Sequence, residues 1–267
     1  MTLEAYETAK LPFVDQVNVD EYIQLDRVST LYESLKATIE KPLKMILLFG
    51  KPGTGKSMML SRLHSELSAS QTVAIYLSPI IEESAFLTVL NRDILDNDTT
   101  ISFPNLIEAL EKKEFTKTPL VLLDEAQLYS DALMEKIRLI SDTRKVKFVI
   151  VLHKTQEEDL IAKEHFQTRI WESIELHNAS LQELQSYIQK KLLKHSQFEI
   201  ANLFKSAQMR LIYKFTKGNY RDTNKLIFTL FEIIQAYIQQ APSKVSTTSL
   251  PKKMIEMAAL KTGFIHA

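Results

Sequence analysis

The sequence contains no cysteine, and none of its apolar runs approaches the length of a membrane helix. The absence of cysteine excludes disulfides and thiolate metal sites and is typical of a reducing compartment. A membrane helix needs about 20 consecutive apolar residues, and the acidic residues 1–7 lack the apolar core of a signal peptide. We therefore expect an intracellular, cytoplasmic protein that does not insert directly into a membrane.

The sequence also lacks net charge, because 33 lysines and arginines balance 33 aspartates and glutamates. Composition therefore does not support nucleic acid or a membrane surface as a partner, and we interpret the short lysine clusters as solvated helix faces. The six histidines show no spacing typical of metal ligands. With 267 residues, the chain has the length of one large domain with a smaller appendage.

Glycine is scarce, yet three of the five glycines lie in the segment 50–57, which reads G-x-x-x-x-G-K-[ST]. The apolar run 45–49 precedes it and a helical pattern follows, as in a phosphate-binding loop. Glycine allows the loop amides to turn inward, the helix N-terminus attracts anions, Lys56 can reach the outer phosphates, and the Ser57 hydroxyl can hold Mg²⁺. We expect nucleotide contacts from Gly50, Pro52, Gly53, Thr54, Gly55, Lys56, Ser57 and Met58.

Five apolar runs alternate with helical patterns in the first two thirds of the chain. This alternation predicts an α/β fold with a parallel sheet sandwiched by helices. The predicted strands are 44–49, 72–77, 119–123, 147–152 and 171–176. Helical patterns alone follow, at 180–194, 202–217, 220–240 and 251–261, with Ser249 placed to cap the last helix. We therefore predict a nucleotide-binding core at 1–177 and a small all-helical lid at 178–267.

The strand predicted at 119–123 ends in two adjacent carboxylates, Asp124 and Glu125. This is the Walker B pattern. A carboxylate at that end of a parallel strand lies beside the phosphate loop, so Asp124 is a candidate ligand of Mg²⁺ together with Ser57. Glu125 is a candidate catalytic residue that orients the attacking water. The two motifs together predict a site for ATP or ADP with Mg²⁺.

Polar side chains follow the strand predicted at 147–152. A side chain there can sense the γ-phosphate and orient water, and we favour Thr155 over His153 for that role. A lone histidine at a strand end is more often a hydrogen-bonded loop residue. Arg169 lies just before the last predicted strand, where an exposed surface arginine is the ordinary interpretation.

The order of these motifs resembles that of an AAA+ ATPase, and within that superfamily the chain is most similar to the ExeA/general secretion pathway protein A group. The resemblance also rests on segments outside the two nucleotide motifs, namely Pro12-Phe13, Arg27, Arg169, 181–188 and 218–224. It implies that Arg169 is an arginine finger acting on a neighbouring subunit and that Arg221 is a lid arginine reaching the phosphates. It also implies that Phe13 stacks on adenine, with an apolar plug between core and lid as the alternative.

The resemblance implies a Mg²⁺-dependent ATPase that couples its nucleotide cycle to conformational or assembly changes acting on a protein partner. Self-association into a ring or filament with ATP is expected with it. Secretion-type members carry a membrane span and a cell-wall-binding module that this sequence lacks, so the secretion role is not carried over. The alternatives are a small-molecule kinase, a DNA-bound regulator of the transposition type, and a nucleotide-binding switch with negligible hydrolysis.

Overall fold

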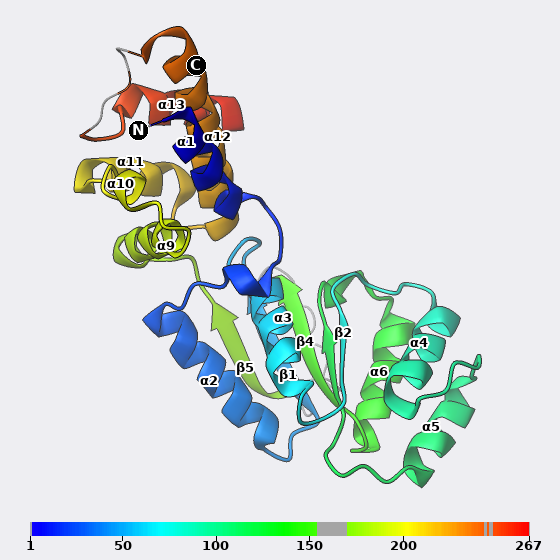
Figure 1. The fold of residues 1–267 in the computed structure, drawn as a ribbon. Coiled ribbons are helices and arrows are strands. Elements are labelled where there is room, and N and C mark those ends of the chain that lie inside the picture. Colours follow the sequence, from blue (N-terminus) through cyan, green and yellow to red (C-terminus); the bar gives the residue numbers. More distant parts are fainter. Residues whose placement is uncertain (1, 154–169, 243–244, 246–247, 267) are drawn as a thin grey trace. The chain divides into compact units, whose positions relative to one another are not determined.

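The computed structural model describes residues 2–153, 170–242, 245 and 248–266. Its contacts divide the chain into two compact units. The sheet unit comprises Arg27–Leu176, and the helical unit comprises Met1–Asp26 together with His177–Ala267 (Figure 1). The sheet unit has a hydrophobic core on each face of its sheet, and the helical unit has a core of its own.

The sheet unit contains a five-stranded sheet with the order β2-β3-β4-β1-β5, in which every neighbouring pair of strands is parallel. The predicted parallel α/β fold is thereby confirmed. Strand β4 lies between β1 and β3, so the loops that follow β1 and β3 flank the end of β4. The strands are β1 Met45–Gly50, β2 Val73–Tyr76, β3 Leu120–Leu123, β4 Lys147–His153 and β5 Ile170–Leu176.

Helices cover both faces of this sheet because its central strands are apolar on both faces. On β1, Met45, Leu47 and Phe49 enter one core, whereas Ile46 and Leu48 enter the other. The first core is shared with α4, α5 and α6, and the second with α2 and α3 (Figure 1). These helices are α2 Asp26–Glu40, α3 Lys56–Leu67, α4 Glu83–Leu95, α5 Phe103–Lys112 and α6 Asp131–Asp142.

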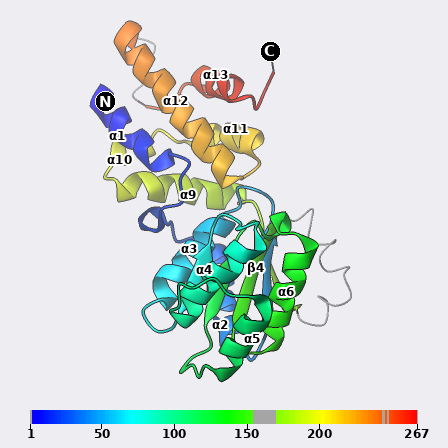
Figure 2. The same ribbon diagram turned by 90° about the vertical axis from the view of Figure 1, so that its right-hand side faces the viewer.

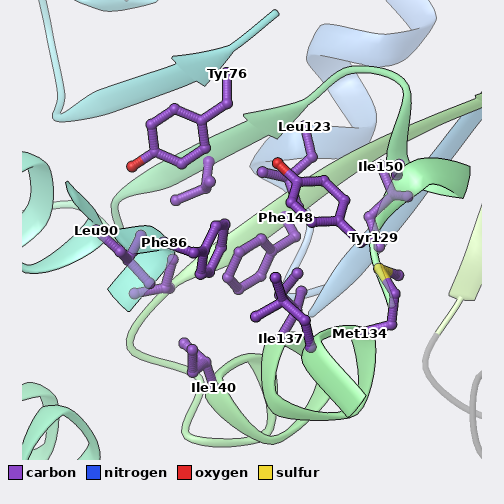
Figure 3. Packing of buried hydrophobic residues seen from close by; sticks show 14 of the residues in the cluster. Tyr76, Phe86, Leu90, Leu123, Tyr129, Met134, Ile137, Ile140, Phe148 and Ile150 are labelled. Carbon is purple, nitrogen blue, oxygen red and sulfur yellow. The ribbon is translucent and has the colours of Figure 1, made fainter. Parts of the chain in front are cut away.

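Aromatic rings fix the segment that follows β3. The Phe86 ring lies between those of Tyr76 and Tyr129, with centroid separations of 5.9 and 5.8 Å, and Figure 3 shows Phe148 in the same cluster. The Ile80 backbone N–H donates to the Tyr129 hydroxyl at 3.4 Å. Because Tyr129 directly follows the short 3-10 turn η3, Ala126–Leu128, this packing holds the turn in place.

The helical unit is built around the long helix α12, with α1 lying along it (Figure 2). A capping box begins α9, in which the Ser180 hydroxyl and the Glu183 carboxylate each accept a backbone N–H of the other residue. The helices are α1 Leu3–Lys10, α9 Leu181–Lys194, α10 Phe198–Ala201, α11 Ser206–Thr216, α12 Tyr220–Gln240 and α13 Lys252–Thr262, with 3-10 turns η1 Leu11–Phe13 and η2 Val19–Glu21.

The N-terminal segment differs from the prediction, which placed residues 1–177 in one domain. Contacts group residues 1–26 with the helical unit instead. The side chains of Tyr6, Ala9 and Phe13 are almost fully buried, and the ring of Tyr6 lies 5.6 Å from that of Phe231 in α12. The sequence shows that α1 has an apolar face but not which core will cover it. In the structure this face packs into the core of the helical unit.

Two predicted helix boundaries also differ from the structure. The helix predicted at 202–217 begins only at Ser206, because the chain leaves helical geometry where Leu203 and Phe204 enter the core. Ser249 does not cap the last helix. Pro251 occupies the N-cap position of α13, with the extended backbone that proline favours.

A buried ammonium group lies in α9. Lys191 is 4% exposed, and its Nζ donates to the Tyr187 hydroxyl at 2.9 Å and lies 5.2 Å from the centroid of the Phe13 ring. The Tyr187 hydroxyl in turn donates to Asn224 Oδ1 at 2.8 Å. Burial lowers the pKa of Lys191 to about 8, although the charge of Glu21 opposes this shift.

Stability should therefore depend on pH through Lys191. Its pKa is lower in the folded chain than in the unfolded chain, so the unfolded chain binds more protons from about pH 8 to 10.5. The free energy of unfolding should then rise with pH across that window, by at most about 3 kcal/mol from this group. Lys191→Met should raise the melting temperature at pH 7 and flatten this pH dependence in thermal denaturation, whereas Lys214→Met, at an exposed position, should do neither. A Lys191→Met protein that melts lower than wild type at pH 7 would contradict a net cost of burial.

Candidate functional site

The loop between β1 and α3 has the backbone that the phosphate-loop motif predicts. Gly53 and Gly55 have φ values of 77° and 95°, and Gly55 precedes α3 in the left-handed conformation without a side-chain cap. The first amides of a helix have no acceptor within the helix, so those of Lys56, Ser57 and Met58 can serve an anion. The Thr54 hydroxyl donates to the Lys51 carbonyl at 2.8 Å and stiffens the loop.

Lys56 turns back over this loop. Its side chain is nearly buried, and Nζ donates to the carbonyl oxygens of Gly50 at 2.9 Å and Lys51 at 3.1 Å. A positive charge is thus held against the loop. Gly50 must be glycine at this point, because a Cβ atom there would lie 2.3 Å from the Leu176 carbonyl oxygen of β5.

The Ser57 hydroxyl and the Asp124 carboxylate contact each other beyond the carboxyl ends of β1 and β3. Ser57 Oγ donates to Asp124 Oδ2 at 2.5 Å, although the two residues follow different strands. Asp124 is 2% exposed. Burial raises the pKa of its carboxyl, although hydrogen bonds from the Ser57 hydroxyl and the Glu125 backbone amide act in the opposite direction. A buried carboxylate is costly unless a cation or a hydrogen-bond donor compensates it.

These two oxygen ligands fit Mg²⁺, which binds through one or two protein oxygens and otherwise keeps water and phosphate ligands. Within the ranges that the structure describes, no group of three or more histidine, cysteine, aspartate or glutamate side chains could hold a metal ion. A metal held by protein ligands alone is therefore not indicated there. The donors present match a metal that arrives with a nucleotide.

The Glu125 carboxylate contacts the side chains of both His153 and Gln127. His153 Nε2 lies 3.2 Å from Oε1 and 3.1 Å from Oε2, and the amide Nε2 of Gln127 donates to Oε2. His153 ends β4 and stands beside Gly50 in the strand register, which brings it to the edge of the sheet that carries both motifs. The backbone of Glu125 is left-handed, with φ of 51°, a conformation that non-glycine residues seldom adopt.

Gln127 was not among the predicted site residues. It follows the carboxylate pair by two positions in Asp-Glu-Ala-Gln, so the sequence held a signal: an amide close behind the candidate catalytic carboxylate. What the sequence did not show is the turn η3, which bends the chain so that the amide faces Glu125. His153, considered as a γ-phosphate sensor, contacts Glu125 in this structure.

The other predicted site residues do not meet in the sheet unit. Thr155 and Arg169 lie outside the residues that the structure describes, so their roles stay predictions. Arg221 belongs to the helical unit, with its side chain 58% exposed and its Nε 3.5 Å from Asp15 Oδ2. Phe13 is 1% exposed, with its ring packed edge-on against Phe231 at 6.0 Å. Such a ring offers no free face to adenine, and stacking would require it to leave this core.

Comparisons with known sequences support the same class of protein. Residues 40–161 match the family model described as an AAA domain. The DNA repair protein RadA of Campylobacter jejuni is 29% identical over 115 residues, which cover 40% of this chain and 25% of RadA. The matched part thus spans about a quarter of RadA's length, so RadA's activity and partners are not carried over by this match.

Solved structures share the fold. A RuvB variant from Thermotoga maritima is 18% identical, with a TM-score of 0.60, covering 94% of this chain and 73% of that chain. Cdc6p from Pyrobaculum aerophilum is 14% identical, with a TM-score of 0.63 and coverages of 86% and 66%. The Aeropyrum pernix ORC1 protein in complex with DNA is 15% identical, with a TM-score of 0.63 and coverages of 95% and 69%.

The sheet order, the glycine loop and the family match define a P-loop nucleotide-binding fold. More narrowly, the chain has the AAA+ fold, with an AAA domain over residues 40–161. That fold implies nucleotide binding. Across the part of the chain that the structure describes, no helix is both long and apolar enough to cross a membrane.

Proposed function

We propose that this protein is a Mg²⁺-dependent ATPase that hydrolyses ATP to ADP and phosphate. The observation that carries the proposal is an arrangement of residues that follow β1 and β3: the Ser57 hydroxyl donates to the Asp124 carboxylate, and the carboxylate of the next residue, Glu125, contacts His153. A nucleotide switch without hydrolysis would need the first two side chains but not a positioned glutamate.

The loop amides and Lys56 would bind the β- and γ-phosphates, and Ser57 and Asp124 would hold Mg²⁺. When bound, Mg²⁺ neutralises charge that develops on the phosphate oxygens. Glu125 would orient a water molecule towards the γ-phosphate and accept its proton. Phosphoryl transfer depends mainly on orientation and charge stabilisation, which is what this set of side chains can supply.

The nucleotide cycle would act on a protein partner through changes in conformation or assembly. Support comes from the resemblance of Arg169 and residues 181–188 and 218–224 to the ExeA group, which implies that Arg221 closes the lid and that Arg169 acts on a neighbouring subunit. On this proposal the protein self-associates into a ring or filament with ATP. Sedimentation that is identical with and without ATP would contradict it.

DNA is the alternative partner, since the Aeropyrum pernix ORC1 structure contains DNA. The zero net charge of this chain does not support that role. A gel-shift assay with ATP separates the two proposals, because a DNA-bound regulator should retain duplex DNA in an ATP-dependent manner. An ATPase that acts on a protein partner should not retain duplex DNA in this assay.

Binding can be tested before chemistry. ATP with Mg²⁺ should raise the melting temperature of the wild type, by the equivalent of about 2.7 kcal/mol at a hundredfold excess over the dissociation constant. Lys56→Ala should remove this stabilisation, because it deletes the charge that the structure holds against the loop. Lys117→Ala, at an exposed position before β3, should respond like wild type. A Lys56→Ala protein that ATP still stabilises fully would remove Lys56 from the site.

A further inference from the structure

Gln127 has one polar contact that explains its orientation. Its amide Nε2 donates to Glu125 Oε2, while the carbonyl oxygen of the same amide is buried and has no hydrogen-bond partner among the described residues. A buried carbonyl without a partner is costly. The orientation is therefore stabilised by the bond to Glu125, since the other end of the amide contributes nothing to it.

The turn that carries Gln127 is held on both sides. The Leu128 N–H donates to the Glu125 carbonyl at 2.9 Å, and the Tyr129 N–H donates to the Ala126 carbonyl at 3.2 Å. Ala126 and Tyr129 are buried in the hydrophobic core that also contains Leu123 and Phe148 (Figure 3). The amide of Gln127 is thus presented to Glu125 from a fixed backbone.

His153 contacts the same carboxylate from a second element. It lies at the end of β4, whose register is fixed by pairing with both β1 and β3. One carboxylate therefore lies between an amide on η3 and an imidazole on β4. A side chain held from two independent backbone elements has lost most of its rotational freedom before substrate arrives.

We propose that Gln127 is a positioning residue, which together with His153 holds the Glu125 carboxylate in the orientation that catalysis requires. The inference rests on the proposed ATPase function and adds a residue that acts through Glu125. A carboxylate released from Gln127 would still be charged and close to the site, but would sample several rotamers. Misplacement of a catalytic group by about 1 Å can reduce the rate on the order of a hundredfold.

Gln127→Met tests the proposal, because methionine has a similar length and cannot donate a hydrogen bond. We expect kcat for ATP hydrolysis to fall about ten- to a hundredfold, with KM for ATP changed less than about threefold. Gln197→Met is the matched control: Gln197 is also half-buried, and its amide donates to the His195 carbonyl at 3.2 Å in the helical unit. The control should keep wild-type kcat.

A double variant separates positioning from simple loss of structure. In a Glu125→Gln background, Gln127→Met should lower the residual rate by less than about twofold, because the carboxylate that it positions is already gone. A merely structural role would multiply the two losses. Equal kcat in wild type and Gln127→Met, or a fully multiplicative double variant, would overturn the proposal.

The contact can also be judged without hydrolysis. In NMR spectra of the nucleotide-free protein, the Gln127 side-chain amide protons should be displaced from those of solvent-exposed glutamines, and Glu125→Ala should remove the displacement. If the wild type hydrolyses no ATP, the proposed function fails, and this spectrum still tests the contact. An amide signal unchanged by Glu125→Ala would overturn the inference whatever the enzyme assay shows.

Discussion

Replacing Glu125 with glutamine should lower kcat for ATP hydrolysis about 10²- to 10⁴-fold while ATP binding survives. The substitution keeps the size and shape of the side chain but removes the negative charge that orients water and accepts its proton. The phosphate-binding groups lie on other residues: the loop amides and Lys56, which contacts the Gly50 carbonyl. Phosphate release at saturating ATP measures the rate, and the ATP-induced rise in melting temperature measures binding.

Glu114→Gln is a suitable control for this experiment, because it makes the same chemical change on a side chain that is 91% exposed. It should hydrolyse ATP at the wild-type rate. Wild-type turnover in Glu125→Gln would instead mean that another residue activates the water, and His153 would then be the first to replace. Loss of ATP binding in Glu125→Gln would assign the carboxylate to binding and not to chemistry.

The sheet and its two loops could be predicted because their signals are local. The glycines and Lys56 define a loop conformation within eight residues, and Asp124 follows directly on a buried apolar strand. The contact between His153 and Glu125 is different in kind. It depends on β4 pairing between β1 and β3, and the order of strands in a parallel sheet leaves no local mark in the sequence.

The N-terminal segment shows the same limit. Helix α1 is amphipathic in pattern, with Tyr6 and Ala9 buried, but an apolar face does not specify which core will cover it. The prediction assigned this segment to the nucleotide-binding core, and the structure packs it in the helical unit. Phe13 lies at the end of the same segment. Adenine stacking and an apolar plug are the two roles that the resemblance leaves open for its ring, which in the structure lies against Phe231 and Lys191.

The second large effect is expected at Gly218, which connects α11 to α12. Its φ is 76°, and a Cβ atom added there would lie 1.9 Å from the Ala179 carbonyl oxygen. The Ala179 N–H donates to the Gly218 carbonyl at 2.9 Å, and the Asn178 side chain donates to the Lys217 carbonyl at 3.1 Å. The start of α12, which carries Arg221, is thus joined to residues 178–179 by contacts that need a residue without a side chain.

Gly218→Ala should therefore lower the free energy of unfolding of the helical unit by at least about 3 kcal/mol, a loss typical of strained or overpacked sites. Gly263→Ala is the matched control, since Gly263 has a similar φ of 81° but a Cβ atom added there would meet nothing within 4 Å. It should lose only the cost of left-handed backbone, about 1 kcal/mol. The difference between the two variants isolates the contact with Ala179.

Chemical denaturation followed by far-UV circular dichroism measures both variants, and fluorescence of the single tryptophan, Trp171 in β5, reports on the sheet unit. Because Gly218 belongs to the helical unit, the dichroism transition should shift more than the fluorescence transition. Equal losses in Gly218→Ala and Gly263→Ala would mean that the backbone at Ala179 moves aside at little cost. Residues 178–179 would then not fix the start of α12, and the orientation of Arg221 would have to be set by contacts further along the helix.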